Sequence, residues 1–344
     1  YGIVGNARKR MRFIFLKGKG SRNMKVKAVG AQLQLEKAEK QRIRRKIFNR
    51  DKYLLVMIIP VVLYYLIFCY LPMTGLYMAF TNFRPGNGFI GMFTGEFVGL
   101  KWFRQFFSSP FAWKLIRNTF LLSFYSLIFG FPIPIIFAIC ITQIKNKLIQ
   151  KGAQVLTYMP YFISTVVICG MIINFLSPTS GILNKLLQDM GVEAINYMGQ
   201  PQYFRAIYVI SGSWQSFGFN SIIFVSAIMG ISPGLYEAMR VDGANKRRII
   251  WNLVLPSILP TIVLLLIMTL GNILNVGFEK VFLLYNEGVY ETADVIQTYV
   301  YRQGIINKNY SYSTAVGLFN SVVGFAIVSI ANTVSRKITA TAIW

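Results

Sequence analysis

The sequence predicts an all-α, polytopic membrane protein with six transmembrane helices. Hydrophobic residues make up 54% of the 344-residue chain and charged residues only 14%, whereas about a quarter of the residues in a soluble domain are charged. Six apolar stretches are long enough to cross a bilayer, which takes about 20 residues of helix. They lie near 53–81, 115–140, 153–175, 203–230, 257–278 and 314–335.

The distribution of basic residues predicts the orientation of these spans. Residues 1–52 hold 17 Lys and Arg residues against three acids. Together with the connections near 141–152 and 240–248 and the tail near 336–337, they would place 26 of the 36 basic residues on one side. The positive-inside rule makes that side cytoplasmic. Six spans with both termini in the cytoplasm satisfy this rule.

The first 50 residues are predicted to form a basic cytoplasmic N-terminal extension, followed by a transmembrane domain over 51–344. The net charge of +24 raises the alternative of nucleic-acid binding. We disfavour it because the basic residues adjoin membrane spans, where anionic lipids attract them. The extension is expected to end in a helix at the membrane surface, roughly over 32–50. The basic residues are therefore expected to contact membrane lipids and no nucleic acid.

The segments inside and between the spans give further expectations. Pro160 in the third span, like Pro132 and Pro134 in the second, removes a backbone donor and predicts a bend. Three segments, 82–114, 176–202 and 279–313, are expected on the outer side. Residues 85–88 read Pro-Gly-Asn-Gly, which predicts a turn, and apolar residues at three- and four-residue spacing over 182–190 predict a short amphipathic helix. Segments of this size suit docking of a partner protein, although many merely cap the helices.

The residue types exclude several kinds of chemistry. The chain has no histidine, which rules out His-based acid–base catalysis and His-ligated zinc. Cys69, Cys140 and Cys169 fall within the expected spans and are interpreted as buried apolar residues. The chain has no GxxxxGK[S/T] phosphate-binding loop. No catalytic residue and no metal site are predicted, and any ATP hydrolysis would belong to another subunit.

The segment 237–256 has the most informative order of residues in the chain. It reads Glu-Ala-Met-Arg-Val-Asp-Gly-Ala-Asn-Lys-Arg-Arg-Ile-Ile-Trp-Asn-Leu-Val-Leu-Pro. Glu237 and Ala238 are expected to open a short helix, which Asp242 and Gly243 break because glycine permits a positive φ. A second short helix then leads to Pro256, where the next apolar stretch begins. The prediction is a helix-turn-helix finger on the cytoplasmic side rather than an ordinary polar loop.

This order resembles the EAA loop of ABC importer permeases, which docks into a groove on the ATPase subunit and transmits its closing motion. The resemblance rests on Glu-Ala, on the glycine and on a Leu-x-Leu-Pro sequence that nine residues separate from the glycine. It implies an ATPase-coupling role for Glu237, Ala238, Asp242, Gly243, Ala244 and Pro256. Met239 stands where the family usually has another alanine, a mild departure because Met is also a good helix former.

Other stretches resemble the carbohydrate branch of this family, the maltose-permease-like proteins that handle oligosaccharides and polysaccharide fragments, including the alginate-type importers. The matching stretches are Tyr70-Leu-Pro-Met-Thr-Gly75, Arg117-Asn118-Thr119 and residues 294–304 and 310–320. The resemblance covers about residues 50 to 344. It implies a permease in the bacterial cytoplasmic membrane that imports an oligosaccharide by alternating access.

The resemblance also implies the partners of the chain. They are a second, related permease subunit, two ATP-binding cassette subunits and an extracellular solute-binding protein. ATP and magnesium would be bound by the ATPase subunits, and no cofactor by this chain, which is not expected to be an enzyme itself.

Polar side chains in the last three spans are the candidate solute path. The apolar stretches contain no Asp or Glu, which disfavours a proton- or sodium-coupled carrier. Amides donate and accept hydrogen bonds to sugar hydroxyls, and aromatic faces cover the apolar side of a sugar ring. Interhelical packing is the alternative for any one of these residues. The candidates are Trp214, Gln215 and Asn220, with Ser213 and Ser216, in the fourth span; Asn272 and Asn275, with Thr269, on one face of the fifth; and Asn320, with Ser321, in the sixth.

Two other functions remain open from the sequence. An ABC permease for an amino acid or a peptide would share the EAA-like loop but not the carbohydrate-branch matches in the first and last spans. A membrane scaffold or channel would need no ATPase partner. Neighbouring genes for a solute-binding lipoprotein and a second EAA-bearing permease would exclude the scaffold or channel.

Overall fold

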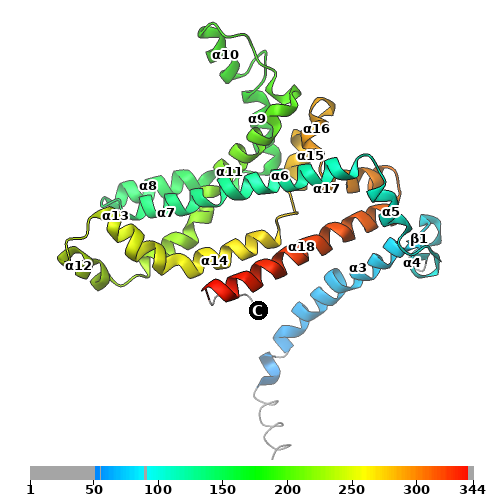
Figure 1. The fold of residues 1–344 in the computed structure, drawn as a ribbon, viewed down its shortest axis with the longest axis horizontal. Coiled ribbons are helices and arrows are strands. Elements are labelled where there is room, and N and C mark those ends of the chain that lie inside the picture. The colour runs from blue at the N-terminus through cyan, green and yellow to red at the C-terminus, as the bar shows by residue number, and fades with distance from the viewer. Residues whose placement is uncertain (1–50, 55, 89–90, 340–344) are drawn as a thin grey trace, which may run out of the picture. The chain divides into compact units, whose positions relative to one another are not determined.

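The computed structural model describes residues 51–54, 56–88 and 91–339, which are mostly helical (Figure 1). The strands in this part of the chain are β1, Thr81–Asn82, and β2, Glu96–Phe97, which pair antiparallel. The chain divides into two units, with the boundary between Thr74 and Gly75. The predicted basic extension and surface helix over 1–50 lie outside the described residues.

The candidate membrane spans confirm the predicted class. Among the described residues, four helices are long and apolar enough to cross a membrane, and two bent helix pairs would bring the number to six. Helices are suited to lipid because their backbone amides and carbonyls bond within the segment. The four are Asp51–Phe80, Ala112–Thr142, Lys246–Gly271 and Tyr310–Lys337.

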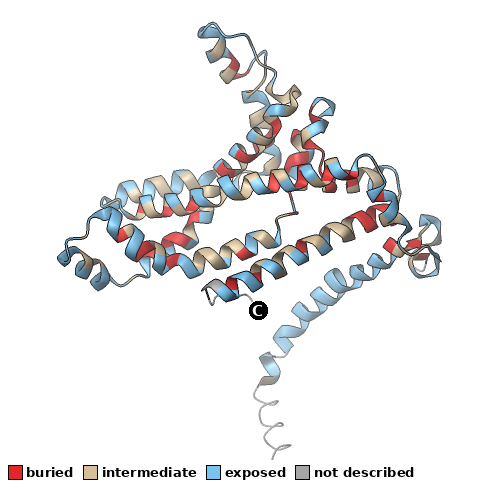
Figure 2. Cartoon of the chain, viewed as in Figure 1, coloured by how far each residue is buried: buried red, intermediate tan, exposed pale blue. Residues whose placement is uncertain are grey.

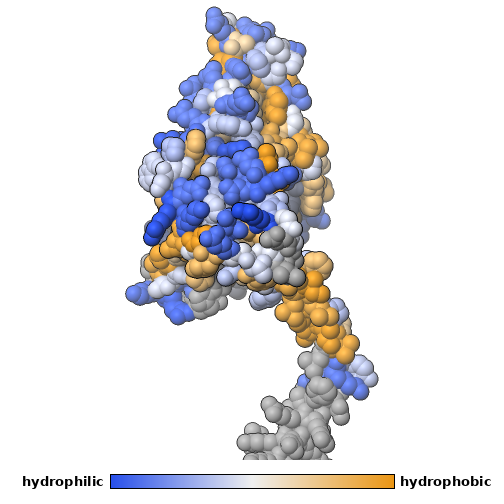
Figure 3. Space-filling model, turned by 90° about the vertical axis from the view of Figure 1, so that its right-hand side faces the viewer, coloured by the Kyte–Doolittle hydropathy of each residue, from blue (hydrophilic) through white to orange (hydrophobic). Residues whose placement is uncertain are grey.

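In the first unit, the described residues, from Asp51 onward, are helical. Leu66–Tyr70 is π-helical, α3 spans Leu71–Met73, and a 3-10 helix over Thr74–Phe80 leads into the second unit. The helix surface is hydrophobic (Figure 3), and none of its most apolar window is buried. A helix that is apolar on every side is suited to contact with lipid or with other apolar helices.

The second unit begins with small elements and then a long helix. A 3-10 turn, Pro85–Asn87, and α4, Gly91–Thr94, lie between the two strands, and α5 spans Lys101–Phe107. Gly88 has a φ of 60°, which confirms the turn predicted over 85–88. α6, Ala112–Gly130, and α7, Pro132–Thr142, then form one candidate span. Pro132 occupies the first turn of α7, where its missing N–H is tolerated.

The predicted third span over 153–175 corresponds to a bent pair of helices. α8, Lys147–Tyr158, continues as a 3-10 turn over Met159–Phe162, and α9, Thr165–Phe175, then leaves at 98°. The bend predicted at Pro160 is confirmed, because extended backbone at residues 163 and 164 separates the two helices. α10, Ile182–Asp189, confirms the predicted short helix, and a 3-10 turn follows at Tyr197–Gly199.

α11, Pro201–Met229, is the fourth predicted span and packs against α6, α7 and α8. Gly218 permits the close approach to α8, because an added Cβ would lie 2.1 Å from the carbonyl oxygen of Thr157. Small residues at such contacts let helix backbones approach each other in membrane proteins. α12, Pro233–Val241, joins α11 at 68°.

The next helix corrects two expectations. α13, Lys246–Ile249, a π-helical turn over Ile250–Val254 and α14, Leu255–Gly271, form one continuous candidate span. Pro256 therefore lies within a helix and does not restart one. The wider π-helical turn, in which the Leu255 N–H bonds to the carbonyl of Ile250, accommodates the proline that follows. The helix ends at Gly271, seven residues before the predicted end at 278.

The segment 278–306, named the cap, connects α14 to the last helix. It contains α15, Phe278–Leu284, a 3-10 turn at Glu287–Val289, α16, Tyr290–Ala293, α17, Ile296–Tyr301, and a π-helical turn at Arg302–Ile306. α18, Tyr310–Thr339, follows and packs along α14 and α17 (Figure 1).

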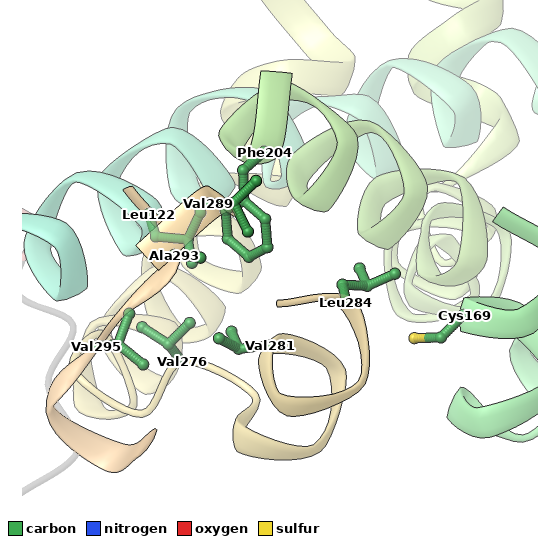
Figure 4. Packing of buried hydrophobic residues seen from close by; sticks show 9 residues of the cluster. All are labelled: Leu122, Cys169, Phe204, Val276, Val281, Leu284, Val289, Ala293 and Val295. Carbon is green, nitrogen blue, oxygen red and sulfur yellow. The ribbon is translucent and has the colours of Figure 1, made fainter. Parts of the chain in front are cut away.

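A hydrophobic cluster fixes the cap to the long helices (Figure 4). Val281 and Leu284 of α15 and Val289 and Ala293 near α16 are almost fully buried. They pack with Leu122 of α6, Cys169 of α9 and Phe204 of α11. Buried residues are frequent in the cap, whereas α12 has none (Figure 2).

Buried polar groups join the same elements. The Asn118 amide of α6 donates to the carbonyls of Glu291 at 2.8 Å and Asp294 at 3.1 Å, and its oxygen accepts from Arg205 of α11 at 3.0 Å. Asp294 forms an ion pair with Arg302 at 2.6 Å and accepts a bond from the Thr298 hydroxyl at 2.8 Å. The cap is therefore held by both apolar packing and buried hydrogen bonds.

Candidate functional site

Two parts of the second unit contain most of the predicted site residues. One is the finger, residues 233–249, made of α12, a turn and α13. The other is a cavity of about 630 Å³.

The turn of the finger is a Schellman motif that requires Gly243. The Ala244 N–H bonds to the Met239 carbonyl at 2.9 Å, and the Gly243 N–H bonds to the Arg240 carbonyl at 3.1 Å. Gly243 has a φ of 75°, a left-handed conformation that glycine adopts without the steric penalty of a side chain. The positive φ predicted from the sequence is therefore confirmed.

A side chain also stabilises the start of the following helix, α13. Asn245 is the N-cap of α13, and its side-chain oxygen accepts from the Arg248 N–H at 2.9 Å. This bond satisfies one of the free amides at the helix start. The sequence interpretation missed Asn245, although Asn immediately before a helix is a recognisable N-cap signal.

The finger has an inner and an outer face. Tyr236, Met239 and Ala244 are partly buried against a hydrophobic cluster that includes Ile249 and Leu253. This packing accounts for a large apolar side chain at position 239. Glu237, Ala238, Asp242 and Gly243 are exposed. Glu237 lies in the middle of α12, which begins at Pro233, and so does not open the helix as expected.

The cavity lies between α6–α7, α11 and the end of α14 with the loop that follows it. Its wall combines apolar residues with hydroxyls and amides. Phe131, Tyr208 and Phe224 contribute aromatic rings. The polar lining residues are Ser123, Ser126, Ser213, Gln215, Ser216, Asn220, Thr269, Asn272, Asn275 and Lys280.

The cavity brings together most of the predicted path residues. Gln215 and Asn220 of α11 line it together with Asn272 and Asn275. Trp214 lies instead in a second cavity of about 790 Å³, beside Tyr125 and Arg205. Asn320 lines neither cavity, and its amide lies 3.5 Å from the Leu274 carbonyl.

The two asparagines of the fifth span reach the cavity in a different way from the one predicted. Asn272 is the C-cap of α14, and Asn275 lies in the loop beyond it. They therefore do not share a helical face. Asn275 accepts a hydrogen bond from the Gln297 amide of α17. The cap segment, 278–306, therefore helps to position the Asn275 side chain.

Two cavity features were missed by the sequence interpretation. The Ser123 hydroxyl of α6 is buried without a hydrogen-bond partner, an arrangement that costs free energy unless a ligand or water supplies one. Lys280 of α15 is buried, with 7% of its surface exposed, and burial lowers its pKa to about 8. Lys280 lies only two residues beyond the predicted end of the fifth span, within the predicted outer segment 279–313.

The wall is suited to holding a polyhydroxylated solute. Serine hydroxyls and amides offer both donors and acceptors, and the aromatic rings can cover apolar C–H groups. No group of three or more metal-ligating side chains occurs among the described residues.

The chain matches a known family and several characterised relatives. Residues 106–340 match the family described as binding-protein-dependent transport system inner membrane component. The chain is 38% identical over 289 residues to Protein LplB of Bacillus subtilis (strain 168), covering 84% of this chain and 90% of that protein. It is 37% identical over 302 residues to the polygalacturonan/rhamnogalacturonan transport system permease protein YteP of the same organism, covering 88% and 93%.

Two solved structures are also similar. A chain of a bacterial ABC transporter involved in the import of the acidic polysaccharide alginate shows a TM-score of 0.79 at 43% identity, covering 86% of this chain and 98% of that one. A chain of a bacterial alginate ABC transporter in complex with an alginate pentasaccharide-bound periplasmic protein shows a TM-score of 0.80 at 43% identity, covering 87% and 99%.

Proposed function

The chain belongs to the family of binding-protein-dependent transport system inner membrane components, and from this membership we propose that it is the permease subunit of an ATP-driven importer of oligosaccharides or polysaccharide fragments. It is a multi-pass protein of the bacterial inner membrane. The relatives that transport polygalacturonan, rhamnogalacturonan and alginate favour a saccharide over an amino acid or a peptide.

The observation that carries this proposal is the composition of the cavity wall. Ten polar residues and three aromatic rings surround about 630 Å³. Amino-acid and peptide solutes carry both an ammonium and a carboxylate, yet no Asp or Glu occurs among the described residues that line the cavity. Hydroxyls and amides beside aromatic faces are instead the groups that bind sugars.

The finger is the proposed coupling element. Glu237, Ala238, Asp242 and Gly243 form its exposed face, which would dock on an ATPase subunit. Ala244 fixes the turn from the inner side, and Pro256 lies where the finger's second helix enters α14. Because α13 and α14 form one continuous helix, movement of the finger would be transmitted to the loop at Asn272 on the cavity wall.

The proposed complex contains a second permease subunit, two ATP-binding cassette subunits and an extracellular solute-binding protein. ATP and magnesium would be bound by the cassette subunits, where hydrolysis would occur. Both termini would lie in the cytoplasm, because this arrangement places the finger and most basic residues on the same side. The similar solved structure of an alginate ABC transporter contains a pentasaccharide-bound periplasmic protein. This similarity supports delivery of the solute by such a partner.

The test is uptake by the assembled complex. The chain is co-expressed with its candidate partner subunits, reconstituted in liposomes and offered an oligosaccharide panel, an amino-acid mixture and peptides, each with the binding protein. ATP-dependent uptake of oligosaccharides alone is the expected result. Uptake of amino acids or peptides instead, or solute flux that needs no ATP, would overturn the proposal.

A further inference from the structure

Lys280 provides the cavity wall with a positive charge that no acid balances. Its ammonium donates to the Tyr208 carbonyl at 3.2 Å and lies 5.0 Å from the centre of the Tyr208 ring. Neither partner is an anion. Within the described ranges, no carboxylate forms an ion pair with Lys280. The ion pair of the cap joins two other residues, Arg302 and Asp294.

The cavity offers this ammonium no counter-charge either. Lys280 is the only lysine, arginine, aspartate or glutamate among the described residues that line the cavity. Its sequence neighbour Glu279 is exposed, whereas Lys280 is buried. The other titratable neighbours are Tyr208 of α11 and Cys169 of α9.

A buried ammonium is costly unless an anion or strong hydrogen-bond acceptors compensate it. A carbonyl and a ring face supply part of that compensation. Buried and intramembrane ionisable groups are therefore frequent markers of functional sites. The position of Lys280 among hydroxyls and amides places its charge where a solute would pass.

We propose that Lys280 recognises a carboxylate of the solute and that the importer therefore takes acidic, uronate-containing oligosaccharides. This inference rests on the proposed function. It adds the charge of the solute and the residue that binds the solute carboxylate. The unpartnered Ser123 hydroxyl lines the same cavity and offers a donor for a sugar oxygen. The ammonium supplies the charge, and the hydroxyls and amides hold the rest of the sugar.

A purely structural role for Lys280 is the alternative. In that case its bond to Tyr208 would only fix α15 against α11, and its removal would affect every solute equally. Gly212 lies close by, since an added Cβ there would be 3.2 Å from the Lys280 ammonium, so this contact is tightly packed. The two roles are separated by a pair of solutes that differ in charge.

The experiment compares an oligogalacturonide with its fully methyl-esterified form, which has the same sugar backbone without negative charge. Uptake is measured in the reconstituted complex at saturating, independently titrated binding protein, and is expressed per assembled complex. The variants are Lys280→Met, which removes the charge; Lys280→Gln, which keeps a donor for the Tyr208 carbonyl; and Lys280→Arg, which keeps the charge.

We expect Lys280→Met and Lys280→Gln to lower uptake of the acidic solute at least tenfold, with uptake of the ester within about twofold of wild type. Lys280→Arg should retain most acidic uptake. If Lys280→Met fails to assemble, Lys280→Gln gives the same comparison. Equal losses for both solutes, or unchanged acidic uptake, would overturn the inference.

The wild-type complex separates this inference from the proposed function. Uptake of neutral oligosaccharides without acidic ones would contradict the acidic solute class while leaving saccharide import intact. Absence of any saccharide uptake would contradict both.

Discussion

The finger and the cap are both short helical segments between longer helices, but different interactions hold them. The turn of the finger is made by neighbours in sequence, with bonds from Gly243 to Arg240 and from Ala244 to Met239. The cap is held by distant residues: the Ile296 N–H donates to Thr119 across 177 positions, and Asn118 reaches Asp294 across 176. The outer face of the finger is exposed, whereas the polar groups of the cap are largely buried.

This difference shows which task each segment can perform. A locally determined, exposed turn can present a docking surface without affecting the rest of the fold. A segment joined to α6 and α11 by buried bonds forms a fixed wall, and here that wall carries Lys280 and positions Asn275. Loss of the buried bonds of the cap should therefore reduce stability, and loss of the turn of the finger should reduce coupling.

The largest expected effect is the loss of the Asp294–Arg302 pair in the cap. Asp294→Ala leaves the Arg302 charge without its carboxylate partner and removes the bond from the Thr298 hydroxyl to Asp294. Breaking a buried pair costs about 3–5 kcal/mol, and the partial exposure of Arg302 favours the lower value. Thermal unfolding of the purified complex should show a clear loss of stability.

The matched control is Glu291→Ala, because Glu291 is an exposed acid of α16 in the same cap. Its loss should change stability by less than about 0.5 kcal/mol. Equal destabilisation by the two variants would mean that net charge, and not the buried network, stabilises the cap.

The second effect concerns the turn of the finger. Gly243→Val forces a β-branched residue into a conformation with φ of 75°, which costs roughly 1–2 kcal/mol locally. We expect an assembled complex in which ATP hydrolysis no longer drives uptake. Gly234→Val is the control, because Gly234 lies in α12 without a positive φ, and it should leave uptake near wild type. Normal ATP-driven uptake in assembled Gly243→Val would show that the turn is not needed for coupling.

The third effect is a pH dependence of acidic-solute uptake. Burial lowers the pKa of Lys280 to about 8, so raising the pH from 7 to 9 reduces its charged fraction from about nine-tenths to about one-tenth. The solute carboxylate stays ionised over this range. Uptake of the acidic oligosaccharide should therefore fall several-fold relative to that of its methyl ester. Parallel profiles for the two solutes, after correction for ATPase activity, would contradict the prediction.

The smallest effect is expected from the asparagines at the end of α14. Asn272→Ala and Asn275→Ala should each weaken uptake a few-fold while the melting temperature changes little, because both side chains are exposed to the cavity. Asn320→Ala is the comparison, since Asn320 lines neither cavity. A lower melting temperature with undiminished uptake per complex would assign Asn272 and Asn275 to packing.

The sequence predicted what is local. The amphipathic α10 and the glycine turn of the finger depend on neighbouring residues, and the structure confirms both. Four of the six apolar stretches correspond to single helices of span length, and the other two correspond to bent helix pairs. Hydropathy does not record direction, so the 98° bend between α8 and α9 was only indicated by Pro160. The hydropathy pattern also did not show that α14 ends at Gly271, because the loop that follows is apolar at Ile273, Leu274 and Val276.

The site was predicted less completely for the same reason. Gln215, Asn220, Asn272 and Asn275 were found because they are polar in apolar surroundings. Lys280 was missed because nothing in its local sequence shows that α15 folds back against α11. Trp214 was grouped with its neighbour Gln215, but consecutive helical residues point in different directions, and the structure places them in different cavities.

The central claim, that the cavity is the solute path, is tested most directly by cysteine accessibility on α11. In a chain with Cys69, Cys140 and Cys169 replaced by serine, Asn220→Cys and Trp214→Cys are labelled with a small hydrophilic maleimide during ATP-driven turnover. Modification at 220 should block uptake, and solute should slow that labelling. Modification at 214 should leave uptake largely unchanged. Uptake that survives complete modification at 220, or labelling there that solute does not affect, would contradict the account.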